Sequence, residues 1–468
     1  MYEKTEHEIE LVDFYHPFGG KMSADNRWVK MARLIPWETL EEKYAAQFKA
    51  LGRRAKKVRM AIGAILIQQK FGYSDLETVI QIIENPYLQY FLGLCEYQEK
   101  QPFDASMMVY FRKRVTPEML DEINKALIGL DKPKPKKKND DNNGPKKNKG
   151  KLIVDATCAP ADIKYPTDLN LLNEAREKLE VMIETACTDG EKPRTYKRIA
   201  RRDYLRAAKN KKLSDRKRRQ AIRKQLNYVK RDLHLLEKMN LQDRLNKRQT
   251  VQLETIRTLY AQQKEMYELE TNSVKERIVS ISQPHVRPIV RGKAGAGTEF
   301  GAKLSISVLD GYVWVDKISW DNFNEGSLLI EQIEAYKIRH GVYPKAVIGD
   351  KIYCTRENRA YCKARNIRLS GPALGRPSND PIDRLKSKRQ EKLDTGIRNM
   401  VEGAFGLTKR KFSLNLIMTK LRETSETAIR LNFTLLNLER RLRLLLRQFL
   451  SDVLNCKINP FRADFGLI

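Results

Sequence analysis

Three carboxylates of this 468-residue chain have the sequence context that a two-metal phosphoryl-transfer site requires. Asp155 and Asp350 each end a short apolar run, and Glu402 lies in a helix-like stretch. A short apolar run bounded by turn signals is typical of a buried strand, and an acid at its end lies at the sheet edge where open α/β folds bind ligands. The sequence therefore predicts two strand ends and one helix that converge on a divalent metal ion.

The stretch around Glu402 carries a second pattern. Arg398, Glu402 and Lys409 are spaced i, i+4 and i+11, so on a helix they fall within about 40° of one another. A carboxylate among cations stays ionised and can hold a hard metal, while Arg and Lys suit nearby phosphate oxygens. The alternative is a solvated helix face with an ordinary i, i+4 ion pair. Together with the two strand-end acids, the pattern favours a functional site.

These residues resemble the DDE-type transposases of bacterial insertion sequences. The shared order is Asp155, then Asp350 within GDKIY, then Arg-x3-Glu-x6-Lys. Four further segments resemble the family: YPTDLNLL after Asp155, RGKAGAGTEFGAK at 291–303, LSGPALGRP at 369–377 and RNMVEGAFG at 398–406. The resemblance spans about Arg59 to Leu445. Family members often carry a Tyr three residues before the Arg, where this chain has Thr395, so the role of that Tyr is not carried over.

The resemblance implies an enzyme with an RNase H-like catalytic core. Such a transposase binds the terminal inverted repeats of its element, cuts at the ends and joins the 3′ hydroxyls to target DNA. Asp155, Asp350 and Glu402 would hold two Mg²⁺ (or Mn²⁺) ions. The residues expected to bind DNA or phosphate are Arg398, Lys409, Arg291, Lys293 and Lys351. The implied partners are double-stranded DNA, at element ends and target, and a second copy in a homodimeric synaptic complex, without a membrane or a small-molecule cofactor.

Two other functions remain open at this point. The first is an RNase H-fold nuclease that hydrolyses DNA without joining it. The second is a catalytically silent, domesticated DNA-binding protein. The presence of all three carboxylates argues against decay of the site.

The composition points to a polyanionic partner. Lys and Arg number 89 against 59 Asp and Glu, which gives a formal net charge of +30 and a pI near 9.7. Neutralising phosphates releases condensed counterions, so an excess of this size favours nucleic acid. Ribosomal, RNA-binding and membrane-surface proteins share this balance, so charge alone does not separate them.

The cysteines and the termini bear on the cellular compartment. The six cysteines show no Cys-x-x-Cys spacing, which argues against a zinc site or a disulfide framework. The start MYEKTEHEIE is acidic and polar, unlike a signal peptide, and the longest apolar stretch, near Ala61 to Ile67, is too short to span a bilayer. We expect a soluble protein of the bacterial cytoplasm, associated with the nucleoid when it acts.

The fold class predicted is α/β. An RNase H-like mixed sheet forms the catalytic core, with an α-helical N-terminal domain and a long, coiled-coil-like helical insertion after the first strand. The sequence alone indicates a mixed α/β fold with a helical insertion, and the resemblance supplies the RNase H-like sheet. The predicted units are 1–130, a helical DNA-binding or dimerisation domain; 131–151, a basic flexible linker; 152–168 and 282–453, the core; 169–281, the insertion; and 454–468, a C-terminal tail.

Apolar spacing defines the insertion. Residues 222–236 carry apolar side chains at a 4-3-4-3 spacing, typical of a coiled-coil seam, and a second such stretch runs from about 241 to 267. We expect two long antiparallel helices joined near Met239. The basic cluster at residues 196–224, expected to face outward on this hairpin, is either a solvated face or a DNA contact, and its local excess of Lys and Arg favours DNA.

Strand signals return after the insertion. Residues 300–309 alternate, Asp310-Gly311 predicts a hairpin turn, and 312–318 form the returning strand. A helix from about 325 to 340 then leads into the strand before Asp350. The Gly-rich segment 292–301 lacks the Gly-Lys-Ser/Thr of a Walker loop, which leaves a strained turn near metal or DNA or a flexible loop.

Overall fold

The computed structural model describes most of the chain. The described residues are 2, 4, 21–49, 52, 54–131, 147–187, 193–210, 212–293, 296–372 and 380–454, with backbone alone at 130–131, 291–293, 296 and 449–454. Most of the predicted linker, most of the segment 369–377 and nearly all of the predicted tail lie outside these residues.

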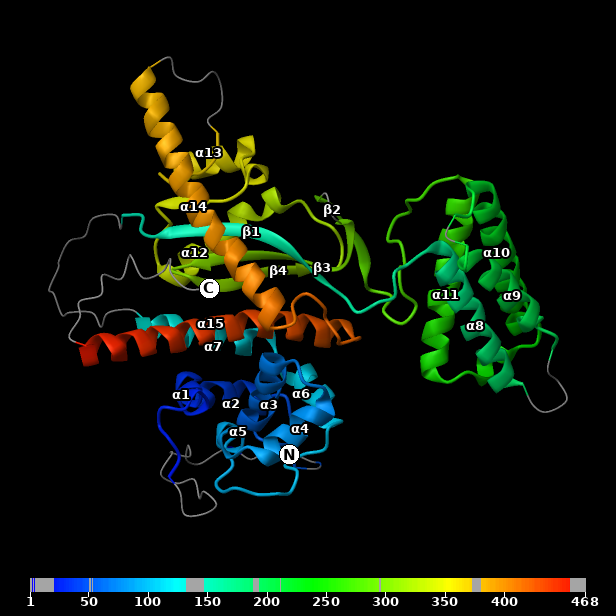
Figure 1. Ribbon diagram of the computed structural model, residues 1–468, viewed down its shortest axis with the longest axis horizontal. Helices are drawn as coiled ribbons and strands as arrows, with labels where there is room; N and C mark the ends of the chain where they lie inside the picture. Colours follow the sequence, from blue (N-terminus) through cyan, green and yellow to red (C-terminus); the bar gives the residue numbers. More distant parts are fainter. Residues whose placement is uncertain are drawn as a thin grey trace.

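A mixed six-stranded sheet organises the core (Figure 1). Its order is β2-β3-β1-β5-β6, with β4 also paired to β3. The central strand β1 is antiparallel to β3 and parallel to β5, as expected for an RNase H-like core. The predicted fold class is thereby confirmed. The strands are β1 (Lys151–Pro160), β2 (Arg287–Lys293), β3 (Ala296–Leu309), β4 (Tyr312–Ser319), β5 (Ala346–Ile348) and β6 (Arg368–Leu369).

The β3–β4 hairpin confirms the turn prediction. Asp310 and Gly311 both adopt positive φ, at 49° and 81°. A two-residue hairpin turn needs this left-handed backbone at both positions, and Asp-Gly is a favoured pair for it. The Gly-rich segment forms the end of the neighbouring β2–β3 hairpin, where Lys293 pairs with Ala296.

Side chains alternate between two apolar layers along β1. Leu152 and Val154 pack with Leu329 of α12 on one face, while Ile153 packs with Val401 of α14 on the other. Burial on both faces explains the continuous apolar run before Asp155. The helices around the sheet are η4 (Glu325–Leu328), α12 (Leu329–His340), η5 (Lys351–Tyr353), α13 (Arg356–Ala364), α14 (Pro381–Lys411) and α15 (Arg422–Leu454).

Seven N-terminal helices in the described residues lie below the sheet, and four of them, α1, α3, α6 and α7, contact α15 (Figure 1). Polar contacts join the two parts: Gln69 donates to Asn432 Oδ1 at 2.8 Å, Asn437 donates to Asn124 Oδ1 at 2.9 Å, and Lys70 is ion-paired with Glu439. These helices share one apolar cluster with a face of the sheet. They are α1 (Arg27–Leu34), α2 (Trp37–Ala45), α3 (Val58–Phe71), α4 (Asp75–Glu84), α5 (Pro86–Phe91), α6 (Met107–Arg114) and α7 (Pro117–Asp131).

Within its described residues the insertion holds four α-helices, so the prediction of two is wrong. Its apolar seam lies on α10 as predicted, but α8 is the main partner of that seam, with α11 beside both. Helices were predicted only at 222–236 and about 241–267, so α8 and α9, which precede both stretches, were missed. The helices are α8 (Asp168–Ala186), α9 (Lys197–Ala208), α10 (Asp215–Lys238) and α11 (Lys247–Glu268), with η3 (Leu241–Arg244) between the last two.

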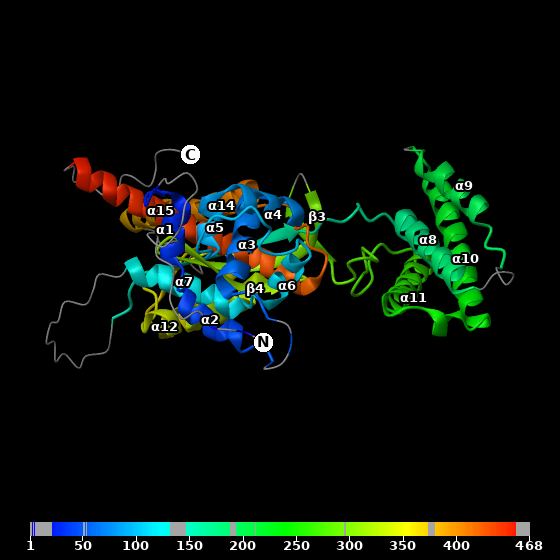
Figure 2. The same ribbon diagram turned by 90° about the horizontal axis from the view of Figure 1, so that it is seen from below.

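The insertion has an apolar core of its own and lies beside the sheet (Figures 1 and 2). Two chain segments connect it to β1 and β2. A hydrogen bond from Gln283 Nε2 to the carbonyl oxygen of Asp162, 2.8 Å long, ties these connectors together although the two residues are 121 positions apart. Across the described residues, no helix is both long and apolar enough to cross a membrane.

Candidate active site

The sequence predicted Asp155 at the end of a strand, but the structure places it in the middle of β1. The strand continues to Pro160 because β3 pairs with it as far as Gly301. On its other side, β5 pairs only with residues 151–153. Asp155 therefore lies just beyond the end of β5, on the side of β1 that β5 leaves unpaired. Its Oδ1 accepts a hydrogen bond from the backbone N–H of Ala156 at 2.8 Å.

Asp350 follows the end of β5, as predicted. It caps η5, and its Oδ1 accepts a hydrogen bond from the N–H of Lys351 at 2.7 Å. Gly349 before it lies so close to β1 that a Cβ there would meet Val154 Cγ2 at 2.8 Å and Tyr353 Cδ2 at 2.9 Å. A side chain at position 349 would thus push the Asp350 turn away from Asp155's strand.

Arg398 on α14 connects two of the predicted acids. Its Nη1 lies 3.3 Å from Asp350 Oδ1, and its Nη2 lies 3.9 Å from Glu402 Oε1. The i, i+4 pair on the helix is therefore present, but the same guanidinium also reaches the end of β5. Asp350 and Glu402 side chains are 58% and 61% exposed, so both remain accessible to solvent.

The surroundings of Asp155 disfavour its negative charge. Burial is the largest cause that raises its pKa to about 6, and the negative charges of Glu325 and Asp350 raise it further. The hydrogen bond from Ala156 and the charge of Arg398 act in the opposite direction. A half-buried carboxylate next to two other acids is short of positive charge.

Glu325 is a fourth acid near this site that the sequence did not single out. It begins η4, and its Oε1 forms an ion pair with Lys303 Nζ at 3.0 Å. The preceding Asn324 caps the turn by accepting from Gly326 N, which gave a signal for a helix start only. Nothing in the local sequence shows that this turn lies near Asp155, because the two are brought together only by the packing of distant elements.

The donor set fits a hard divalent cation in its chemistry. Carboxylate oxygens are the ligands that Mg²⁺ and Mn²⁺ prefer, and the guanidinium of Arg398 shows that a positive charge is accommodated between Asp350 and Glu402. The three acids are not drawn into one cluster: in the part of the chain that the structure describes, no group of three His, Cys, Asp or Glu side chains could hold a metal ion.

The remaining predicted residues are spread around the sheet. Lys351 directly follows Asp350, while Lys409 is a half-buried residue near the end of α14. Arg291 and Lys293 lie on β2, which β3 separates from β1, and their side chains are not described. Thr395 is exposed, and its hydroxyl donates to the carbonyl of Glu391 at 2.9 Å.

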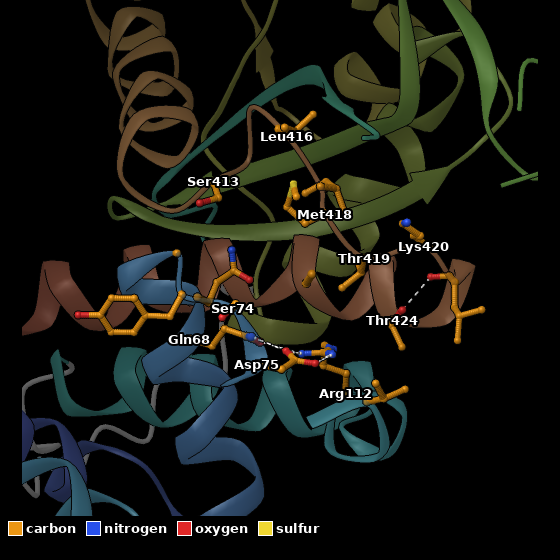
Figure 3. Close-up of a pocket in the computed structure, with 17 residues that line it drawn as sticks. Gln68, Ser74, Asp75, Arg112, Ser413, Leu416, Met418, Thr419, Lys420 and Thr424 are labelled. Carbon is orange, nitrogen blue, oxygen red and sulfur yellow. Dashed lines mark hydrogen bonds and ion pairs between the residues drawn. The ribbon is translucent and has the colours of Figure 1, made fainter. Parts of the chain in front are cut away.

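A separate cavity of about 600 Å³ lies between the N-terminal helices and the segment that joins α14 to α15 (Figure 3). Within it Arg112 donates two 2.8 Å hydrogen bonds to the two carboxylate oxygens of Asp75, and Gln68 donates to Oδ1 at 2.6 Å. Burial opposes the charge of Asp75, but these bonds lower its pKa overall. The acid in this cavity is already compensated, in contrast to Asp155, and none of the predicted site residues lines the cavity.

Comparisons with known proteins agree with this fold class. The model of the family "Transposase DDE domain" matches residues 347–439, and that of the family "Transposase domain (DUF772)" matches residues 17–114. "Uncharacterized protein ORF8 in nfe locus" of Rhizobium meliloti is 31% identical over 186 residues, which cover 38% of this chain and 82% of that protein. No solved structure matches the chain.

The fold class and these matches define a transposase with an RNase H-like core. The chain belongs to the DDE transposase family. The matched segment 347–439 includes Asp350, Arg398 and Glu402, whereas Asp155 lies outside both matched segments.

Proposed function

We propose that this protein binds the terminal inverted repeats of an insertion sequence, cleaves DNA at the element ends and transfers the 3′ ends to target DNA. The observation that supports it most is the contact of Arg398 with both Asp350 and Glu402, close to an Asp155 whose charge is opposed by its neighbours. Clustered charges with perturbed pKa values are typical of functional sites.

Each side chain has a role in this proposal. Asp155, Asp350 and Glu402 would hold two Mg²⁺ (or Mn²⁺) ions. Such ions, when bound, supply activation of the attacking oxygen and stabilisation of the leaving oxygen. Arg398 orients Asp350 and Glu402 through its two contacts and presents its remaining N–H groups to a phosphate.

Further cations would bind the DNA backbone at positions distant from the reacting bond. Lys409 and Lys351 flank the acids in sequence, and Arg291 and Lys293 stand on the β2–β3 hairpin. The net charge of +30 supports a duplex DNA partner. We further propose a homodimer that pairs the two element ends, acting at the nucleoid in the bacterial cytoplasm.

The test uses the left and right ends of the element from which the protein comes. Each end is incubated with the protein and Mg²⁺, and breaks and joints are mapped by sequencing. Breaks at the ends that become joined to target DNA are expected. Breaks without joints would instead identify a nuclease, and binding without breaks a catalytically silent DNA-binding protein.

A further inference from the structure

The outer side of the insertion is strongly basic. Residues 193–224 contain fifteen Lys and Arg against two Asp. Figure 1 places α9 on the side of the insertion farthest from the sheet, and Figure 2 shows α9 and α10 together on that side. We define the basic face by eight exposed side chains of α9, its C-terminal cap and the first turns of α10: Arg198, Arg201, Arg202, Arg206, Lys209, Arg216, Lys217 and Arg223.

The orientation of α9 is fixed by its contacts with the bundle. Ala200 is fully buried, and its carbonyl oxygen accepts a hydrogen bond from Gln225 of α10 at 3.3 Å. Tyr204 donates to Asn170 of α8 at 2.9 Å. At 100° per residue, Arg198 and Arg202 then lie on the side of α9 opposite to Ala200.

The two acids of this segment form their ion pairs with cations outside the basic face, although Arg206 of that face acts on the charge of Asp203. Asp203 points inward, with 12% of its side chain exposed, and accepts hydrogen bonds from Lys224 at 3.2 Å and Tyr228 at 3.0 Å. Asp215 is ion-paired with Arg218 at 3.0 Å. Among the described residues, no carboxylate forms an ion pair with any of the eight side chains of the basic face.

These eight cations, without ion pairs in the part of the chain that the structure describes, repel one another. That repulsion is relieved by a partner with regularly spaced negative charges, and each phosphate neutralised also releases counterions. We propose that the basic face binds the phosphate backbone of duplex DNA without reading its sequence. The inference rests on the proposed function, which supplies duplex DNA as the partner, and adds a second DNA contact far from the acids.

The test compares two matched triple variants of the full-length protein. One removes three charges from the basic face, Arg198→Gln, Arg202→Gln and Lys209→Gln. The other removes three exposed charges elsewhere on the insertion, Lys238→Gln, Lys247→Gln and Arg248→Gln. Binding of a 30-base-pair duplex of unrelated sequence is measured without metal from about 0.05 to 0.3 M salt, a range over which backbone contacts change affinity strongly.

The basic-face variant should reduce the magnitude of the slope of log affinity against log salt by about 2 to 3. Its affinity at about 0.1 M salt should fall on the order of 100-fold. The control should change the slope by less than about one. Equal changes in both variants, no change in either, or tighter binding of an RNA duplex than of the DNA duplex would overturn the inference. Circular dichroism melting of both variants confirms that the bundle is folded.

This assay is independent of cleavage. A protein that never cuts DNA can still lose salt-dependent binding when the basic face is neutralised. Loss of the proposed enzymatic function therefore leaves this result standing. Conversely, a wild-type protein that cuts element ends while both triple variants bind duplex DNA normally would overturn the basic face alone.

Discussion

Asp155 in the core and Asp232 in the insertion are two buried acids with different surroundings. Burial is the main cause that raises the pKa of each to about 6. Asp232, which is fully buried, accepts two hydrogen bonds from the guanidinium of Arg231, at 2.9 and 2.7 Å. Asp155 accepts one hydrogen bond from the backbone, and two further acids, Glu325 and Asp350, act on its charge.

The comparison shows that a raised pKa alone does not identify a reactive site. Arg231 supplies Asp232 with a cation from the adjacent residue of the same helix, and both hydrogen bonds from its guanidinium go to Oδ1. Oδ2 of Asp232 is buried without a hydrogen-bond partner among the described residues. Around Asp155, the two further acids oppose its charge, while the cation that favours it, Arg398, is shared with two other carboxylates. The sign of the neighbouring charges separates a structural acid from one that favours an added cation.

The largest expected effect is on cleavage. Asp155→Asn, Asp350→Asn and Glu402→Gln should each lower cleavage of element ends by about 10³-fold or more, because an amide keeps the shape but loses the charge that holds a metal. Binding of the ends should stay near the wild-type level. Single-turnover cleavage with Mg²⁺ and a binding assay without metal measure the two properties.

Asp232→Asn is the matched control, since it makes the same chemical change at an equally perturbed acid. Its cleavage rate should stay within about threefold of wild type, a difference of less than 1 kcal/mol in barrier. Cleavage by two of the three core variants at more than a trace level would refute the assignment of the acids.

The next largest effect is a difference in cleavage rate between variants of Arg398 and of Arg231. Arg398→Ala should lower cleavage by one to two powers of ten, because a contact with a charged group contributes roughly 1.5–3 kcal/mol when it is made in the transition state. Arg231→Gln should instead leave the rate near wild type and lower the melting temperature. Mn²⁺ titration by calorimetry completes the test: metal affinity lost equally in Arg398→Ala and Glu402→Gln would mean that the helix face is structural.

A smaller effect is expected at Gly349. Gly349→Ala should destabilise the protein by about 1–3 kcal/mol and slow cleavage, because its Cβ overpacks against Val154 and Tyr353. Gly396→Ala on α14 is the control, since nothing lies within 4 Å of its added Cβ and alanine favours the helix by up to about 1 kcal/mol. Denaturant unfolding of both variants gives the comparison, and equal destabilisation would contradict it.

The smallest effect is a pH dependence of stability in the insertion. The folded-state pKa of Asp232 is raised above its ordinary value, so the folded protein binds the proton more tightly. The contribution of Asp232 to stability is therefore fully present below pH about 4 and is lost as pH rises through about 6. Asp232→Asn should reduce the change in the free energy of unfolding over this pH range by about 1–2 kcal/mol, measured by denaturant melts. An unchanged pH dependence would show that Arg231 compensates for the burial.

Local signals in the sequence were sufficient for several elements. The Asp310-Gly311 turn, the strand end before Asp350 and the helix with Arg398 and Glu402 depend on neighbours along the chain, and the structure has each of them. The position of Asp155 within β1 was not predictable in this way, because the length of β1 depends on β3, more than a hundred residues later.

Contacts between distant elements were also beyond the sequence. The reach of Arg398 to Asp350 depends on how α14 crosses the end of β5, and Glu325 approaches Asp155 only through the packing of η4. In the insertion, the periodic stretch identified α10, but its main partner α8 was not predicted, although α8 buries apolar residues at a similar alternating spacing of three and four. Charge counts located the basic segment without showing which side chains point outward.

The hydrogen bond between Gln283 and Asp162 has a consequence for how the chain folds. Strands β1 and β3 are neighbours in the sheet but are separated by the whole insertion, and the entropy lost on closing a loop grows with its length. The four helices have a core of their own and mostly local contacts, which form quickly. When they fold first, the two connectors are brought together, and β1 meets β3 across a short effective loop instead of a flexible chain of more than a hundred residues. The insertion thus shortens the conformational search that its own length would otherwise impose.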